Sequence, residues 1–353
     1  MKTFQQFENK IRSVPTAASW YLADLGEAKG KQELFTRQSP QKLKVLKQHA
    51  LIESAISSNR IEGVTVDQAR VATVVLGRTH LKDRNEEEVR SYREALDWIH
   101  RDAAKIPVSE KTILKLHQMS RGQIWDAGKY KEKNVDIIEK LPGGGERLRF
   151  KTAEASKTRV FADKLIEAWQ DCLKEKKVQP LIALAAFNLD FLCIHPFRDG
   201  NGRVSRLLLL LQSYALGYEV GRYISLERLI EQNKDRYYET LHQSSRGWHE
   251  GKHDPWPYIH YVLYIFKIAY QEFEKRVGQV KSPRGAKTDF VESAIHGFKN
   301  EFTLSDLEKA CPGVSHDMIR RVLKDLQQAK KVECLGRGPG AKWRKKGSTS
   351  KRG

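Results

Sequence analysis

HPFRDGNGRVSR, residues 195–206, is a polar segment that contains two glycines and three arginines. It lies between two apolar segments, Leu181 to Ile194 and Leu207 to Leu211, which both indicate buried helices. Because Pro196 cannot continue a helix, the first helix should end at His195 and leave its imidazole at the edge of the core. We therefore expect two packed helices that are joined by a short polar loop.

The residues of this loop are typical of a phosphate-binding site. Gly200 and Gly202 allow backbone angles that other residues avoid, so successive N–H groups can converge on an anion where the second helix begins. Arg203 and Arg206 are three residues apart and share a helix face, and guanidinium groups pair well with phosphate oxygens. Asp199 offers a hard carboxylate that could hold Mg²⁺ beside the phosphates.

His195 is the group in the loop that can accept a proton near neutral pH, which suits a general base for an attacking hydroxyl. A phosphate loop of the GxxxxGK[ST] kind is excluded, because no such string occurs and the glycines follow a helix instead of a strand. A capped turn with two solvated arginines would use some of the same residues, but the complete string favours a site.

The string resembles the signature of the Fic family, whose members mostly transfer AMP from ATP to a protein hydroxyl. The resemblance implies a mainly α-helical Fic (Fido) domain in which His195 deprotonates the target hydroxyl and Asp199 binds Mg²⁺. The backbone from Gly200 to Gly202 would hold the α-phosphate, and the two arginines would bind the distal phosphates. The ATP-binding residues that the resemblance implies are Glu62, Phe197, Gly200, Asn201, Gly202, Arg203, Arg206 and Tyr237. Among them, Phe197 is interpreted as the ring that anchors the loop to the core.

A second segment, SNRIEG at residues 58–63, resembles the inhibitory motif of Fic proteins. It follows Gln41 to Ile56, whose apolar spacing predicts a helix. The resemblance implies that Glu62 enters the nucleotide pocket, pairs with Arg206 and displaces the γ-phosphate, because both anions need the same guanidinium. The inhibitory residues would be Ser58, Glu62 and Gly63. Taken alone, the pattern equally fits a capped helix end with a solvated glutamate.

Apolar residues spaced three to four apart predict helices over most of the chain before residue 281. The exception is Lys133 to Phe150, where alternating apolar residues flank Pro142 and three glycines and predict a β-hairpin. In Fic enzymes a hairpin called the flap precedes the signature and aligns the target by strand pairing. The flap residues would be Val135, Asp136, Ile137 and Ile138, although an ordinary surface hairpin also fits.

The segment Asn233 to Tyr238 resembles the part of the family whose aromatic residue lines the adenine pocket. The resemblance implies that Tyr237 is this residue. Two adjacent tyrosines on a helix are also a common packing pattern, so a purely structural role stays open.

Positive charge is concentrated in the last fifth of the chain. The formal net charge is +19, and residues 281–353 hold 17 Lys and Arg against 8 Asp and Glu. In this part we expect helices over Phe290 to Phe298 and Leu304 to Ala310, and a third helix capped by Ser315. A strand, a glycine-rich tip and a second strand follow. This order is the outline of a winged helix-turn-helix, which binds DNA in some proteins and docks or dimerises proteins in others.

The expected organisation is therefore an N-terminal helical region with the inhibitory helix (1–108), a Fic catalytic core with its following helices (109–280), a linker (281–285), a winged helix-turn-helix (286–345) and a basic tail (346–353). The opening MKTFQQFENKIRSVP lacks the apolar stretch of an export signal, and no later stretch is long enough to span a bilayer. Four scattered cysteines without CxxC spacing favour reduced thiols. We expect a cytoplasmic protein without a membrane partner.

The function expected from the resemblance is an autoinhibited protein adenylyltransferase, a nucleotidyltransferase that uses ATP and Mg²⁺. Its substrates would be Ser, Thr or Tyr hydroxyls of proteins, itself included. The alternative is a nucleic-acid-binding regulator whose Fic domain is inactive or removes AMP. DNA as a partner and a homodimer both stay open.

Overall fold

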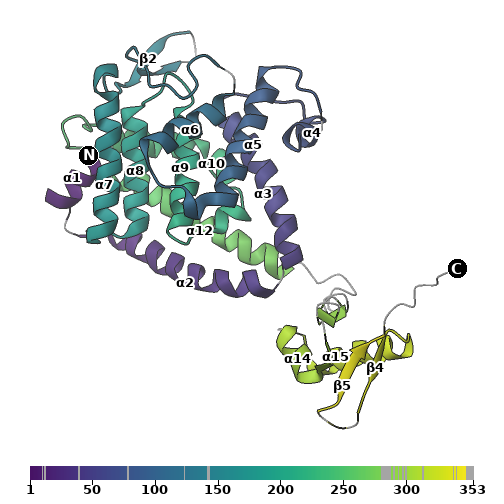
Figure 1. Cartoon of the computed structure of the whole chain (residues 1–353). Coiled ribbons are helices and arrows are strands. Elements are labelled where there is room, and N and C mark those ends of the chain that lie inside the picture. The colour runs from purple at the N-terminus through teal and green to yellow at the C-terminus, as the bar shows by residue number, and fades with distance from the viewer. Residues whose placement is uncertain are drawn as a thin grey trace. The chain divides into compact units, whose positions relative to one another are not determined.

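The computed structural model describes residues 1–9, 11, 13–38, 40–77, 79–122, 124–140, 144–279, 288, 291, 292, 294, 295, 298, 300–311, 314–336, 338 and 340–346. The chain divides into two compact units: Met1–Leu34 with Gln41–Lys275, and Phe35–Pro40 with Arg276–Gly353. Most described residues are helical (Figure 1), which confirms the expected mainly α fold class. None of the helices in the described ranges is long and apolar enough to cross a membrane.

The first unit is built around helix α8 (Pro180–Ile194), of which thirteen of the fifteen residues are buried. Pro180 occupies the first turn, and the side chain of Gln179 accepts the N–H groups of Leu181 and Ile182, so the helix start is capped. The helix ends at Ile194 with His195 as its C-cap, as the following Pro196 predicts. Helices α7 (Thr158–Glu175) and α9 (Asn201–Ala215) pack against α8 on either side (Figure 1).

The remaining elements surround this centre. Helix α1 packs on α8, and α5 and α6 pack on each other and on α9. Most of the two regions expected to form an N-terminal segment and a catalytic core, residues 1–34 and 41–275, lies in one compact unit. The bounds of the other elements up to residue 279 are α1 (Lys2–Asn9), α2 (Thr16–Gln38), α3 (Pro40–Ile61), α4 (Val71–Val75), α5 (Arg84–Asp102), η1 (Ala103–Lys105), α6 (Glu110–Arg121), η2 (Ala155–Lys157), η3 (Val220–Arg222), α10 (Leu226–Gln232), α11 (Lys234–Ser245) and α12 (Trp256–Gln279).

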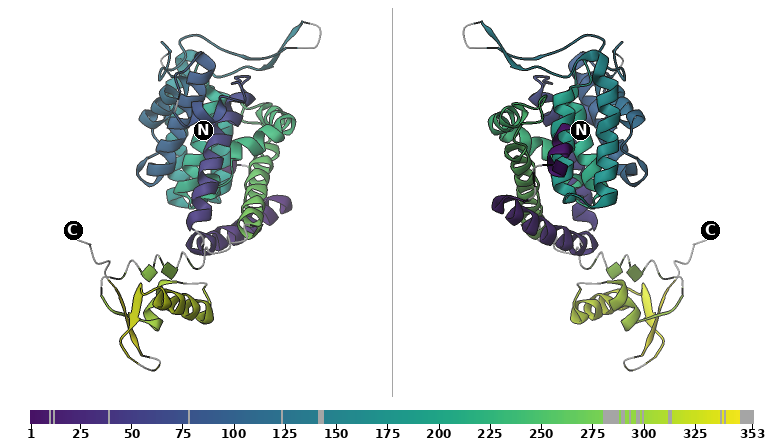
Figure 2. Two further views of the ribbon diagram at one scale, coloured as in Figure 1. Left: turned by 90° about the vertical axis from the view of Figure 1, so that its right-hand side faces the viewer. Right: turned by 90° about the vertical axis from the view of Figure 1, so that its left-hand side faces the viewer.

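A hairpin of strands β1 (Ile137–Lys140) and β2 (Glu146–Phe150) lies within the segment expected to form one. The strands are antiparallel, with Ile138 opposite Leu148, and Figure 2 shows the hairpin extending from one end of the helices. Residues 141–143, which include Pro142 of the expected tip, lie outside the described residues. Helix α11 packs against β2, so the hairpin lies beside the element that carries Tyr237.

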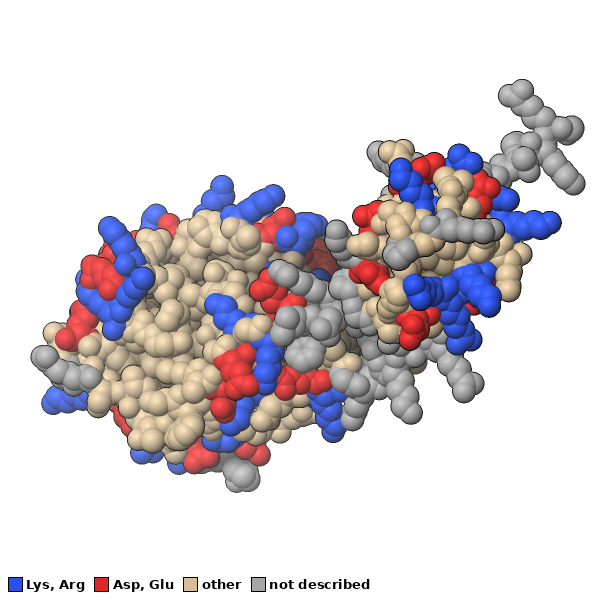
Figure 3. All heavy atoms as spheres, turned by 90° about the horizontal axis from the view of Figure 1, so that it is seen from below, with Lys and Arg blue, Asp and Glu red and all other residues tan. Residues whose placement is uncertain are grey.

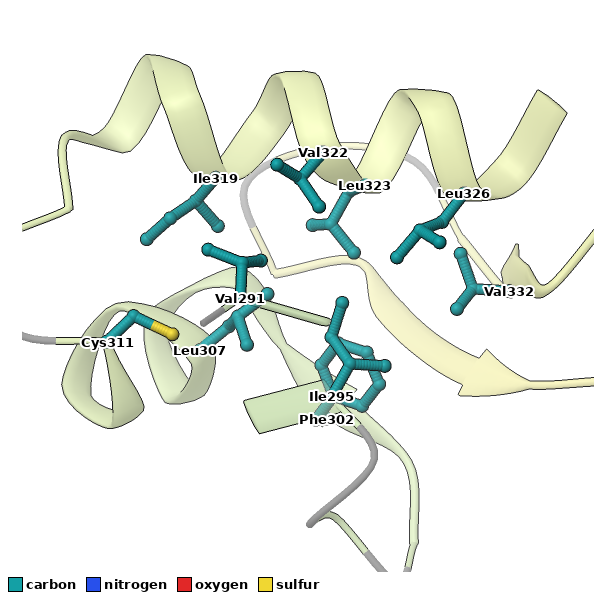
Figure 4. Packing of buried hydrophobic residues seen from close by; sticks show 10 residues of the cluster. All are labelled: Val291, Ile295, Phe302, Leu307, Cys311, Ile319, Val322, Leu323, Leu326 and Val332. Atoms are coloured by element: carbon teal, nitrogen blue, oxygen red, sulfur yellow. The ribbon is translucent and has the colours of Figure 1, made fainter. Parts of the chain in front are cut away.

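The second unit contains strand β3 (Phe302–Thr303), helices α14 (Leu304–Ala310) and α15 (His316–Gln328), and strands β4 (Val332–Cys334) and β5 (Lys342–Lys345). The strands form an antiparallel sheet in the order β3-β5-β4. A stripe on α15, made of Ile319, Val322, Leu323 and Leu326, packs onto the buried side chains of this unit (Figure 4). The helix expected over Phe290 to Phe298 falls partly outside the described residues.

Candidate active site

The loop between α8 and α9 is held in one shape by its own residues. His195 adopts a left-handed backbone conformation with φ of 53°, and its N–H donates to the carbonyl of Phe191 at 2.9 Å. Gly200 has φ of 82° immediately before α9, a conformation that a side chain would strain. Both ends of the Asn201 amide bond the backbone of Phe197, at 2.9 and 2.8 Å. Asn201 therefore braces the loop between the base and the helix.

Phe197 packs this loop against helix α6. Its ring is fully buried and stacks on His117 of α6, with the ring centroids 3.8 Å apart. Nδ1 of His117 accepts the N–H of Gly128, so Nε2 carries the proton and donates to the carbonyl of Asp199 at 3.0 Å. Burial lowers the pKa of His117 to about 4, which keeps the ring in this neutral form. The anchoring role expected for Phe197 is consistent with these contacts.

The imidazole of His195 is held in its neutral form, which is the form that can accept a proton. Burial, followed by the charge of Lys131, lowers its pKa to about 4, so its imidazole is neutral near pH 7. Its Nδ1 is buried and has no hydrogen-bond partner among the described atoms. Lys131 donates from Nζ to Thr152 and to the carbonyl of Ile194, which places its ammonium directly beside the end of α8.

Arg206 of α9 is bound by Ser58 in the last turn of α3 and by Glu62, which directly follows this helix. Its Nη2 donates to Oε1 of Glu62 at 2.8 Å and to the carbonyl of Ser58 at 2.9 Å, and its Nε donates to the Ser58 hydroxyl. The side chain of Arg206 is 3% exposed and that of Glu62 is 27% exposed, so the ion pair opens toward solvent only on the glutamate side. Burial opposes the charge of Arg206, but Glu62 raises its pKa overall.

Glu62 also lies against the first turn of α9. A Cβ added at Gly202 would collide with Oε1 of Glu62 and would lie 3.1 Å from Nη1 of Arg206. The absence of a side chain at Gly202 thus lets a carboxylate approach the positive end of the helix dipole. Gly63 follows with φ of 82°, where the chain turns away from α3.

Arg203 is 1% exposed and is held by two buried partners. Its Nη1 donates to Oε2 of Glu88 at 2.6 Å and to the amide oxygen of Asn59 at 3.3 Å. Its Nε, like Nη1 of Arg206, is buried without a hydrogen-bond partner among the described atoms. A buried donor without a partner is costly, so each arginine keeps one N–H that an anion at this place would satisfy.

Asp199 remains ionised and partly open to solvent, with 56% of its side chain exposed. Its burial would raise the pKa, but the charges of Arg121 and Arg203 and the N–H of Gly200 lower it overall. Oδ2 contacts Nη1 of Arg121 at 2.8 Å and Oδ1 accepts the N–H of Gly200 at 2.6 Å. In the part of the chain that the structure describes, no group of three or more His, Cys, Asp or Glu residues could hold a metal ion.

A cavity of about 420 Å³ connects several of the residues that the sequence singled out. Its lining includes Glu62, His195, Gly202, Tyr237 and three residues at the start of the hairpin, Asp136, Ile137 and Ile138. Val135 lies just before the hairpin and accepts the Thr152 hydroxyl through its carbonyl. Tyr237 is 3% exposed and its ring packs near those of Tyr258 and Tyr261.

Four residues of the site were not anticipated from the sequence: Glu88, His117, Arg121 and Lys131. They lie 63 to 115 positions before the arginine, loop or helix end that they contact. Glu88 lies in the charged run NEEEVR, which reads as a solvated helix face, yet its side chain is 3% exposed. The spacing of Glu88 from Val89, Tyr92 and Leu96 on the apolar face offered one weak signal of its burial.

The part of the chain that contains this site is similar to known proteins. Residues 107–213 match the model of the Fic/DOC family. A curated protein adenylyltransferase Fic from Nematostella vectensis is 26% identical over 227 residues, 60% of this chain and 46% of the relative. One from Drosophila melanogaster is 24% identical over 211 residues, 58% of this chain and 39% of the relative. The chain thus spans less than half of the length of these relatives.

Solved structures share the fold. A Fic family protein from Desulfovibrio desulfuricans G20 aligns with a TM-score of 0.62 at 23% identity, over 96% of this chain and 98% of that one. Fic-1 (aa134–508) from C. elegans aligns with a TM-score of 0.60 at 18% identity, over 75% and 74%. The family match contains all of residues 195–206, and together with the relatives and the shared fold it supports a Fic/DOC family domain in this chain.

Proposed function

We propose that this chain is a protein adenylyltransferase that is held in an autoinhibited state. It would transfer AMP from ATP to a Ser, Thr or Tyr hydroxyl of a protein and release pyrophosphate. The observation that carries the proposal is one cavity in which the neutral base His195 and the Glu62 carboxylate both lie, with Glu62 bound to Arg206. Relatives named protein adenylyltransferase Fic support the reaction type.

ATP is proposed to lie with its phosphates at the start of α9. The unpartnered N–H groups of Arg203 and Arg206 would then donate to phosphate oxygens, and Tyr237 on the cavity wall would face the adenine. His195 removes the proton of the target hydroxyl, whose oxygen forms a bond to the α-phosphorus. The bond from this phosphorus to the bridging oxygen breaks, and pyrophosphate leaves with those electrons. Catalysis rests on positioning and charge neutralisation.

Asp199 is proposed as the protein ligand of Mg²⁺. A single ionised carboxylate that is more than half exposed suits an ion that binds through one or two carboxylates together with substrate phosphates. The ion would neutralise phosphate charge when ATP is bound. Asp199 is oriented for this by Arg121 and by the N–H of Gly200, and the loop in turn is braced by Asn201.

The inhibition is proposed to come from competition for Arg206. Glu62 binds Nη2 of this arginine and approaches the first turn of α9. The γ-phosphate of a productively bound ATP would need the same N–H group of Arg206 and the same place beside the helix. Ser58 strengthens the competition because its hydroxyl and carbonyl hold the same guanidinium. An incoming target would pair with the edge of the hairpin near Asp136 to Ile138, beside the cavity.

The activity is tested by incubating the full chain with a protein extract, ATP and Mg²⁺. We expect Glu62→Gly to release more pyrophosphate than the wild type, and mass spectrometry to find one adenylyl group on a hydroxyl side chain. Arg206→Ala in the same background should lose this activity. Adducts of a phosphoryl group alone would refute AMP transfer.

A second function, DNA binding, is favoured by the distribution of charge in the C-terminal unit. From His316 to Lys346 the chain holds ten Lys and Arg against three Asp and Glu, whereas residues 288–315 hold two against five. Lys and Arg side chains project in groups from this unit in Figure 3. Within α15, Arg320, Arg321 and Lys324 are exposed on the face opposite the buried stripe.

The arrangement around α15 fits a winged helix-turn-helix. Helix α14 precedes α15 across a short connection, and the β4-β5 hairpin follows it. The second helix of a helix-turn-helix enters the major groove, so the exposed cations of α15 would meet phosphates and base edges of duplex DNA. This activity would either accompany AMP transfer or define a regulator whose Fic domain has another role.

DNA binding is tested with the full chain and a labelled duplex of about 30 base pairs across a range of salt concentrations. Each lost phosphate contact changes the slope of log K against log salt by about 0.9, so replacing Arg320, Arg321 and Lys324 by Ala should reduce the slope by about 2 to 3. The charge-matched control replaces the exposed Lys174, Lys176 and Lys252 of the first unit. Equal slopes for both triple variants, or stronger binding to anionic vesicles, would rule out this function.

A further inference from the structure

Glu88 is the buried carboxylate that two arginines of the site share. It lies on α5 and is 3% exposed. Its Oε2 accepts Nη1 of Arg203 at 2.6 Å, and its Oε1 lies 3.4 Å from Nη1 of Arg121. Arg84 also contacts Oε1, at 3.0 Å, but its side chain is 62% exposed, so this third cation adds little.

The two buried arginines that contact Glu88, Arg203 and Arg121, lie in different parts of the site. Arg203 belongs to the proposed phosphate-binding face of α9. Nη1 of Arg121 bonds Oδ2 of Asp199 at 2.8 Å, and its Cδ lies 2.9 Å from the position of a Cβ at Gly200. One carboxylate therefore touches the group that would hold phosphate and the group that orients the proposed metal ligand.

We propose that Glu88 is a positioning residue that sets Arg203 for the phosphates and, through Arg121, sets Asp199 for Mg²⁺. The inference rests on the proposed AMP transfer. It is separate from the inhibitory contact, because Glu62 binds Arg206 and has no bond to Arg203 or Arg121 among the described contacts.

Loss of the Glu88 charge would leave Arg203 and Arg121 without the carboxylate that they share. Without Glu88, Arg121 keeps its contact with Asp199 at 2.8 Å, and the charge of Arg203 also acts on this carboxylate, whose pKa both arginines lower. The two guanidinium groups would then compete with the metal ion for Asp199. Arg203 would also leave its present place, and misplacement by about 1 Å can lower a rate by about 100-fold.

Glu86 is a matched control on the same helix. It is also 3% exposed, and its carboxylate binds Arg70 at 2.5 and 2.8 Å. Arg70 contacts the carbonyl of His80 and no residue of the active site among the described contacts. Replacing either glutamate by Gln removes a buried ion pair, so both variants should lose stability, whereas Glu88→Gln alone should change catalysis.

The test uses the full chain with Glu62→Gly, alone and combined with Glu88→Gln or Glu86→Gln. For Glu88→Gln we expect a kcat about 10- to 100-fold lower and a half-saturating Mg²⁺ concentration about 10-fold higher. Calorimetric titrations of ATP use a His195→Ala background, which prevents turnover, and give one Kd without Mg²⁺ and one with Mg²⁺. Glu88→Gln should lower the ratio of the first Kd to the second about 10-fold. Glu86→Gln should match the parent in all three measurements.

Equal values for the two Gln variants would overturn the role of Glu88. If Glu62→Gly itself transfers no AMP, the proposed function fails, but the ratio of the two Kd values still tests Glu88. Should Glu88→Gln not fold, Glu88→Asp replaces it, because Asp keeps the charge but is one methylene shorter. The Asp variant should show the same loss of Mg²⁺ dependence to a smaller degree, and unchanged dependence would refute the inference.

Discussion

Removing the Glu62 carboxylate should tighten ATP binding by an amount that the contacts allow us to estimate. Glu62 and Arg206 form a charge-assisted hydrogen bond of 2.8 Å, with the arginine buried and 27% of the glutamate exposed. Such bonds contribute about 1.5 to 3 kcal/mol, and solvent on the glutamate side reduces the value toward about 2 kcal/mol. If ATP must displace this bond, Glu62→Gly should lower the Kd for ATP about 30-fold.

The measurement is calorimetric titration of Mg-ATP into His195→Ala and into His195→Ala with Glu62→Gly, so that no turnover occurs. Helix α3 ends at Ile61, and a glycine at position 62 therefore adds no cost inside a helix. Glu53→Gln serves as the control, because Glu53 lies on α3 and binds Arg228 in another part of the unit. A Kd that stays within about two-fold of the parent, or an equal gain from Glu53→Gln, would refute the competition.

Three further outcomes are expected. The rate of AMP transfer by Glu62→Gly should stay level between about pH 6 and 8. It should fall only as the pH approaches the His195 pKa of about 4, because the imidazole is then protonated. A loss of rate already near pH 6.5 in a pH–rate profile would contradict this. Ser54→Ala removes a donor that bonds Oε2 of the buried Glu227 at 2.7 Å, and urea unfolding should show a loss of about 1 to 3 kcal/mol. Leu323→Ala should destabilise the separate core of the C-terminal unit by about 2 to 5 kcal/mol in its own unfolding transition, while AMP transfer by Glu62→Gly is unchanged.

The local structure around the signature could be predicted from the sequence. The expected helix from Leu181 to Ile194 is α8 from Pro180, and it ends with His195 as its C-cap because a proline follows. The expected helix from Leu304 to Ala310 has the same bounds as α14. These predictions succeed because apolar spacing, capping residues and proline act within a few residues of each other.

Other elements carried weaker signals. Apolar spacing predicts a helix from Ala155 to Lys174, but this stretch begins with a 3-10 turn and α7 starts at Thr158. The apolar spacing gives no bounds for the long helix α2, Thr16–Gln38. Its apolar residues do not form a clear stripe in the sequence, and its burial depends on the rest of the unit.

The partners of the site residues could not be predicted in the same way. Glu88 looks like a solvated charge until α5 and α9 pack and bring it to Arg203. Asn201 was assigned to the nucleotide from family resemblance, whereas both ends of its amide bond the backbone of Phe197. Such contacts depend on tertiary packing across long sequence separations, and a single sequence does not display them.

In the proposed mechanism, His195 and Glu62 act in opposite directions on the transfer of AMP. It is tested most directly by incubating the full chain and a protein extract with Mg²⁺ and ATP labelled on the α-phosphate. We expect strong labelling of protein by Glu62→Gly, weak labelling by the wild type and none by Glu62→Gly combined with His195→Ala. Labelling from the γ-phosphate instead, or equal labelling with and without His195, would contradict it.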